Sequence, residues 1–125
     1  MSFNNIRVLI VDDSAIIRKI IQRSLPLEKY ELVGVAANGL EALKLFKSTM
    51  PQIVTLDITM PEMDGLVVLE EMLRISPDVK VIVISALTDK ATGIKAIKKG
   101  AKSFIPKPFT TTEVQKIILK LSEGL

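Results

Sequence analysis

Short apolar runs alternate with longer amphipathic segments along the whole chain. Each amphipathic segment has the length of a helix, and the clearest one places Val114, Ile117, Ile118 and Leu121 at helical spacing. The apolar runs have the length of strands and are apolar throughout, as is typical of parallel strands covered on both faces. They span residues 6–11, 32–36, 53–56, 79–84 and 103–105. The pattern predicts five consecutive β-α units.

Turn-forming and capping residues fall between these segments. Asn38-Gly39 predicts the start of the second helix, Asp64 can cap the third, and Gly100 suits the end of the fourth. An alternating chain of 125 residues predicts one domain, residues 1–125, with a doubly wound, flavodoxin-like α/β fold. We expect a five-stranded parallel sheet in the order 2-1-3-4-5 with helices on both faces.

The fourth helix differs from the others in its apolar side chains. Ile94 and Ile97 are its only large ones, so we expect them to be its anchors. Gly93 in its interior costs about 1 kcal/mol relative to alanine. We therefore expect this helix to be the least firmly docked. Pro106 falls in the fifth strand, which the expected order places at an edge, where proline is tolerated.

Composition excludes several kinds of site. The chain has no cysteine and no histidine, which excludes disulfides, thiolate zinc sites and a histidine general base. No export signal or membrane-spanning run is evident, so we expect a cytoplasmic protein without membrane insertion. The net charge is +3, but residues 85–125 hold 8 lysines and only 3 acidic residues. This third of the chain is the expected face for an acidic partner.

The carboxyl ends of the predicted strands carry the polar residues of chemical interest. Asp12 and Asp13 follow the first strand, Asp57 the third, Ser85 the fourth and Lys107 the fifth. In doubly wound sheets the carboxyl ends of all the strands lie along the same border of the sheet, the carboxyl-terminal edge, and ligands bind there. Clustered carboxylates repel one another unless a cation compensates, and Mg²⁺ favours such oxygen ligands. With a lysine and a hydroxyl nearby, the set suits phosphoryl transfer to Asp57 as nucleophile.

Four segments combine these polar residues with the apolar runs: V-L-I-V-D-D-S at residues 8–14, D-I-T-M-P-E-M-D-G at 57–65, V-I-V-I-S-A at 81–86 and K-S-F-I-P-K-P-F at 102–109. Through these segments the sequence resembles the receiver domain of two-component response regulators over essentially its whole length. Within the family, the length and the last segment are most similar to the single-domain chemotaxis regulators.

The resemblance implies a phosphorylation site with Mg²⁺ as its cofactor. Asp57 would accept a phosphoryl group from a histidine kinase. Asp13 and Asp57 would ligate Mg²⁺ directly, Asp12 through water, and Thr59 through its main-chain carbonyl. Lys107 would pair with the phosphoryl group, and the Lys107-Pro108 bond is expected to be cis. Since the chain has no histidine, the phosphohistidine must belong to another molecule.

The resemblance also implies a conformational switch. The Ser85 hydroxyl would move toward the phosphoryl group, and Phe104, at the aromatic switch position, would move inward with it. We expect the surface of the fourth helix, fifth strand and fifth helix to change and to bind an output protein. A flagellar motor switch protein is one candidate, and a phosphatase is a further possible partner. We expect a monomer that does not read nucleic acid directly.

Other functions fit parts of the same pattern. A phosphorelay intermediate, or the receiver domain of a larger regulator, would carry the same residues. An aspartate-nucleophile phosphatase also uses aspartate, magnesium and lysine, but it typically has a second acid where Thr59 stands. FMN and dinucleotide binding are disfavoured because Asp12-Asp13 occupies the place of a phosphate-binding loop. We therefore expect a signalling protein rather than an enzyme, one that assists only its own phosphorylation and dephosphorylation.

Overall fold

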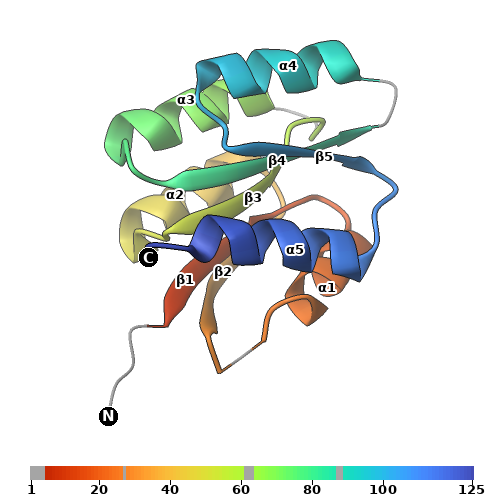
Figure 1. Ribbon diagram of the computed structural model, residues 1–125. Coiled ribbons are helices and arrows are strands. Elements are labelled where there is room, and N and C mark those ends of the chain that lie inside the picture. Colours follow the sequence, from red (N-terminus) through yellow and green to blue (C-terminus); the bar gives the residue numbers. More distant parts are fainter. Residues whose placement is uncertain (1–4, 27, 61–63, 87–88) are drawn as a thin grey trace.

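The computed structural model describes residues 5–26, 28–60, 64–86 and 89–125, which form the expected β-α units (Figure 1). The strands are β1 (Ile6–Val11), β2 (Tyr30–Ala36), β3 (Ile53–Asp57), β4 (Lys80–Ala86) and β5 (Ser103–Lys107). The helices are α1 (Ala15–Arg23), α2 (Gly39–Thr49), α3 (Gly65–Ile75), α4 (Lys90–Lys99) and α5 (Thr111–Ser122). No helix among these is long and apolar enough to cross a membrane.

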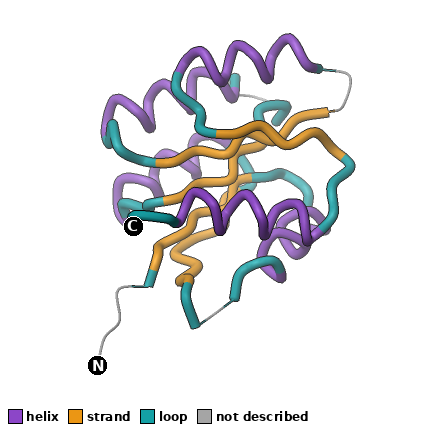
Figure 2. Tube along the Cα trace, viewed as in Figure 1, coloured by secondary structure: helices purple, strands orange, loops and turns teal. Residues whose placement is uncertain are grey.

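The strands form one parallel sheet in the order β2-β1-β3-β4-β5, which confirms the predicted topology. Helices α2, α3 and α4 cover one face, and α1 and α5 cover the other, as Figures 1 and 2 show. The carboxyl ends of β1 and β3 are therefore adjacent at the centre of one edge of the sheet.

Each strand supplies both faces of the core because successive side chains point to opposite sides of the sheet. In β1, Leu9 and Val11 belong to the cluster under α2–α4, whereas Val8 and Ile10 belong to the cluster under α1 and α5. All four are fully buried. A sheet covered on both sides explains why the strands read as continuous apolar runs rather than alternating ones.

The predicted punctuation is confirmed at the helix ends. Asn38 caps α2 by accepting from the Glu41 N–H, and Asp64 caps α3 by accepting from the Leu66 N–H. Gly100 ends α4 at φ 119°, a left-handed conformation that favours glycine. The edge position of Pro106 and the cis Lys107-Pro108 bond are confirmed as well.

The predicted anchors of α4 are wrong. Ile94 and Ile97 are 57% and 44% exposed, and the buried residues of this helix are Gly93 and Ala96. Small residues on the inner face let the α4 backbone approach the sheet closely, which leaves the large apolar side chains on the outside. Counting large apolar residues therefore identified the wrong face of the helix.

Candidate functional site

Three carboxylates meet at the carboxyl ends of β1 and β3. Asp12 directly follows β1 and Asp57 ends β3, and both side chains are buried, whereas Asp13 is exposed. One carboxylate oxygen from each of the three lies within 4.8 Å of the others. The structure thus brings together the three acids that the sequence singled out. They lie together because parallel pairing of β1 with β3 aligns the two strand ends.

Lys107, at the end of β5, reaches into this acidic cluster. Its Nζ atom donates a hydrogen bond to Asp57 Oδ2 at 3.1 Å and lies 3.3 Å from Asp12 Oδ2. Burial lowers the pKa of Lys107, but the charges of Asp12 and Asp57 and their contacts outweigh it, so its pKa is raised. The lysine therefore brings a permanent positive charge to two buried carboxylates.

The orientation of the Asp57 carboxylate is fixed mainly by Thr59. The Thr59 amide and hydroxyl both donate to Asp57 Oδ1, at 2.9 Å and 2.6 Å. The sequence analysis assigned the Thr59 main-chain carbonyl to the metal site and did not predict the hydrogen bond from the Thr59 hydroxyl to Asp57. A threonine two positions after an aspartate at a strand end favours this local bonding, so the signal was present. The metal-binding role of the carbonyl stays a prediction.

Asp12 has one satisfied and one unsatisfied carboxylate oxygen. Oδ1 accepts the Ser14 N–H at 2.9 Å. Oδ2 is buried and accepts no hydrogen bond from any residue that the structure describes, although Lys107 lies nearby. Burial raises the pKa of Asp12, and so does the charge of Asp57, against the lowering effects of the Ser14 amide and Lys107. The carboxylate is thus held in a place that disfavours its own charge.

A second basic residue, Arg18, binds the main chain of the loop that follows β1 and carries Asp12 and Asp13. Arg18, on α1, donates from Nη1 to the Asp12 carbonyl oxygen at 2.7 Å. Sequence reasoning did not single out Arg18, because a surface arginine on an amphipathic helix gives no sign of which backbone oxygen it will reach. Its hydrogen bond ties the first turn of α1 to the loop that carries the acids.

The oxygens of this cluster fit a hard divalent cation. A buried carboxylate oxygen without a hydrogen bond, next to two further carboxylates, is the donor set that Mg²⁺ prefers. A cation there would offset the repulsion among the three acids. The acidic cluster is therefore a candidate metal centre.

Ser85 and Phe104 lie on the face of the sheet that α4 covers. The buried Ser85 hydroxyl donates to Asp89 Oδ2 at 3.4 Å, a long hydrogen bond to the residue that caps α4. Phe104 is half-buried, and β5 pairs it with Val83 of β4. Residues 83 and 85 point to the same side of β4. The serine and the phenylalanine therefore lie under the same helix.

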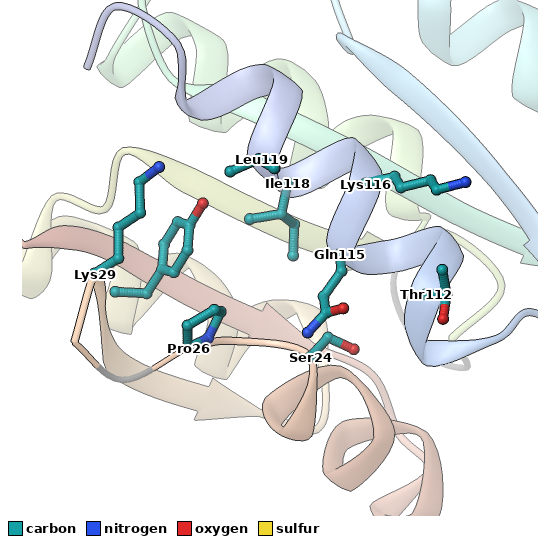
Figure 3. Close-up of a pocket in the computed structure, with 9 residues that line it drawn as sticks. Ser24, Pro26, Lys29, Thr112, Gln115, Lys116, Ile118 and Leu119 are labelled. Atoms are coloured by element: carbon teal, nitrogen blue, oxygen red, sulfur yellow. The ribbon is translucent and has the colours of Figure 1, made fainter.

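A separate groove of about 380 Å³ lies between α5 and the segment that joins α1 to β2 (Figure 3). Pro26, Tyr30 and Leu119 are among the residues that line it. None of the site residues expected from the sequence lines it. The chemistry-bearing residues thus gather at the acidic cluster and not at this groove.

Comparisons with known proteins agree with this geometry. A family model described as the response regulator receiver domain matches residues 8–119. The chemotaxis protein CheY of Thermotoga maritima is 46% identical over 117 residues, which cover 94% of this chain and 98% of that protein.

Solved structures are similar over nearly the whole chain. The REC domain of AraT, a response regulator from Geobacillus stearothermophilus, has a TM-score of 0.88 and 30% identity, covering 94% of this chain and 92% of that one. A chain in the CheX-CheY-BeF₃-Mg²⁺ complex from Borrelia burgdorferi has a TM-score of 0.85 and 36% identity, covering 93% and 88%. The chain therefore belongs to the family of response regulator receiver domains, the phosphorylation-activated switches of two-component signalling.

Proposed function

We propose that Asp57 is the phosphoryl acceptor of this chain, in a reaction that depends on Mg²⁺. The observation that carries this proposal is the 3.1 Å contact between the buried Asp57 carboxylate and the Lys107 ammonium, within a cluster of three acids. Asp12, Asp13, Asp57 and the main-chain carbonyl of Thr59 would hold Mg²⁺, which supplies positive charge to the phosphoryl oxygens when bound.

The proposed step is an in-line displacement at phosphorus. The two hydrogen bonds from Thr59 hold Oδ1 of Asp57, and Oδ2 attacks. The bond from phosphorus to the donor nitrogen breaks, and its electron pair stays on the donor imidazole. Asp57 becomes an acyl phosphate, and Lys107, close to the new oxygens, offsets part of the added charge.

The phosphoryl donor is proposed to be the phosphohistidine of a separate kinase. The chain contains no histidine, so it cannot form the phosphohistidine itself. We propose that residues 1–125 act as a single receiver domain that assists its own phosphorylation and dephosphorylation and catalyses no other reaction. Turnover of many molecules of a generic phosphoester would instead favour the aspartate-nucleophile phosphatase.

Phosphorylation is proposed to change the surface of α4, β5 and α5. The Ser85 hydroxyl would leave Asp89 and turn toward the phosphoryl group, and Phe104 would move into the space that Ser85 vacates. Seven exposed lysines lie in this part of the chain, which suits an acidic output partner. They are Lys90, Lys95, Lys98, Lys99, Lys102, Lys116 and Lys120.

Chemotaxis is the signalling pathway that we propose for this switch. The identity of 46% to a CheY that matches nearly end to end supports it. A flagellar motor switch protein is the proposed output partner, and a CheX-like protein or phosphatase is a second one, since CheX accompanies CheY in the Borrelia complex. Binding of a purified flagellar switch protein, measured with and without beryllofluoride, tests this role. Binding only in the presence of beryllofluoride would support it. The same dependence with a phosphotransfer protein would favour a relay.

Substitution of the acceptor tests the phosphorylation site. With acetyl phosphate and Mg²⁺, intact-mass spectrometry should find one phosphoryl group on the wild-type chain and none on Asp57→Asn. Asp64→Asn is the matched control, because asparagine can still cap α3 and the change lies outside the acidic cluster. Unchanged labelling of Asp57→Asn would remove Asp57 from the acceptor role.

A further inference from the structure

Gly93 lies on the inner face of α4, although glycine is a poor residue for a helix interior. It is buried together with Ala96, while Ile94 and Ile97 point outward. A glycine that weakens its helix at a buried position commonly marks a close approach by a neighbour. The neighbour here is Phe104.

The Phe104 ring lies directly against the α4 backbone at Gly93. A Cβ atom placed on Gly93 would lie 2.7 Å from Cε1, 2.8 Å from Cδ1 and 2.9 Å from Cζ of that ring. Cβ atoms in proteins essentially never come within 3.0 Å of a heavy atom outside their own residue and its two chain neighbours. The present position of the ring is therefore available only because residue 93 has no side chain.

Other glycines make close contacts of a different kind. A Cβ atom on Gly65 would meet the backbone of Ile58 at 2.3 Å, and one on Gly100 would meet a methyl group of Leu73 at 2.8 Å. Neither neighbour takes part in the proposed switch. Among these three glycines, only Gly93 has as its neighbour the side chain that is proposed to move when Asp57 is phosphorylated.

We propose that Gly93 is a positioning residue of the switch, which leaves free the space that the Phe104 ring occupies in the unphosphorylated protein. This inference rests on the proposed function, in which Phe104 leaves that position. A side chain at position 93 would penalise the resting conformer and not the conformer with Phe104 turned inward, so it would shift the population toward the second. The absence of a side chain at one position of α4 thus helps to keep the unphosphorylated protein in its resting state.

Gly93→Ala should move the ring and pre-activate the switch. In protein with ¹³C-labelled phenylalanine and without phosphate, nuclear Overhauser contacts between the Phe104 ring and residue 93 should be lost, and contacts to Ser85 should appear. The apparent affinity for beryllofluoride with Mg²⁺ should rise about fivefold, at the lower end of typical coupling between sites. Titration calorimetry measures this change.

The Phe104→Ala background separates the effect of the ring from that of the helix. Without the ring, Gly93→Ala adds a helix-favouring methyl group in free space, so the urea midpoint should rise, whereas it should fall when the ring is present. Beryllofluoride affinity should then change less than about twofold, well below typical coupling between sites.

Several results would overturn the inference. These are an equal gain in affinity in both backgrounds, an unchanged affinity in the wild-type background, or a ring that keeps its place while α4 shifts. If wild-type protein fails to bind beryllofluoride, or still binds it as Asp57→Asn, the proposed function fails and the switching role of Gly93 falls with it.

Discussion

At the scale of single residues, Asp12 is completely buried, and few hydrogen bonds stabilise its carboxylate charge. Its Oδ2 atom accepts no hydrogen bond from the described residues, and burial raises its pKa. The folded state therefore favours the protonated carboxyl more than the unfolded state does. The protonated carboxyl therefore stabilises the folded state relative to the ionised one. This stabilisation is fully present below the ordinary pKa of aspartate and is lost as the pH rises through the raised pKa of Asp12. Above the raised pKa, the Asp12 charge destabilises the metal-free protein.

Asp12→Asn should therefore stabilise the metal-free protein at pH 7. Asparagine keeps an oxygen for the Ser14 N–H and removes the charge beside Asp57, while Lys107 retains its hydrogen bond to Asp57. We expect about 1 kcal/mol more unfolding free energy, by urea denaturation in EDTA, with a gain that shrinks as pH falls into the range where Asp12 protonates.

Asp12→Ala is the control for this substitution, because it removes the charge and also the acceptor of the Ser14 amide. It should be less stable than Asp12→Asn by about 1 kcal/mol, the net value of one hydrogen bond. A metal-free Asp12→Asn protein less stable than wild type at pH 7 would mean that the carboxylate is well solvated or well paired.

The sequence predicted which ionisable residues meet at this site but not how they contact one another. Apolar runs locate the strand ends, and strand order then brings Asp12, Asp57 and Lys107 to one edge. The Thr59 hydroxyl bond to Asp57 is local, and the spacing of the two residues favours it, although it was not predicted. The Arg18 guanidinium bond to the Asp12 carbonyl depends on a side-chain rotamer that no periodicity encodes, so this contact required the structure.

At the scale of elements, the strands and caps were predictable and the packing face of α4 was not. Strand ends follow from continuous apolar runs, and Asn38, Asp64 and Gly100 act within one turn of the backbone. The inner face of α4 depends instead on the shape of β5, where Phe104 fills the space that a large helix residue would need. A helix that packs through small residues gives a misleading apolar pattern.

One buried pair of hydroxyls joins β2 to α5. The Ser122 hydroxyl donates to the Ile118 carbonyl oxygen at 2.6 Å, so its single proton is in use. The 2.6 Å contact between Tyr30 Oη and Ser122 Oγ therefore has tyrosine as the donor. Tyr30 is 2% exposed, so its hydroxyl depends on this acceptor.

Removal of the Ser122 hydroxyl and removal of the Tyr30 hydroxyl should therefore lower the unfolding free energy by different amounts. Ser122→Ala leaves a buried tyrosine hydroxyl without its acceptor and should cost about 1–3 kcal/mol of unfolding free energy. Tyr30→Phe leaves Ser122 bonded to Ile118 and should cost only about 0.5–1.5 kcal/mol. Urea denaturation of both variants measures the difference, and a larger loss for Tyr30→Phe would contradict the assignment of the donor.

At the scale of the whole molecule, the fold concentrates like charges in the site because β1 and β3 are neighbours. Asp12, Asp13 and Asp57 bring three negative charges to the sheet edge, and Lys107 brings one positive charge. Unfolding moves Asp57 away from Asp12 and Asp13, so the repulsion between Asp57 and the other two acids acts on the folded state alone. An ion that binds the cluster should thus stabilise the entire fold and not only the loops that contact it.

Mg²⁺ should accordingly raise the unfolding free energy of the wild-type chain. When free Mg²⁺ is about ten times its dissociation constant, mass action gives about 1.4 kcal/mol. Thermal unfolding with and without Mg²⁺, at ionic strength matched with NaCl, measures this gain. Asp13→Asn, which removes the exposed member of the cluster, should reduce the gain, whereas Asp78→Asn should retain it, because Asp78 precedes β4 and lies toward the opposite edge of the sheet. Equal stabilisation of both variants, or by NaCl alone, would show that Mg²⁺ acts through general screening and not at the acidic cluster.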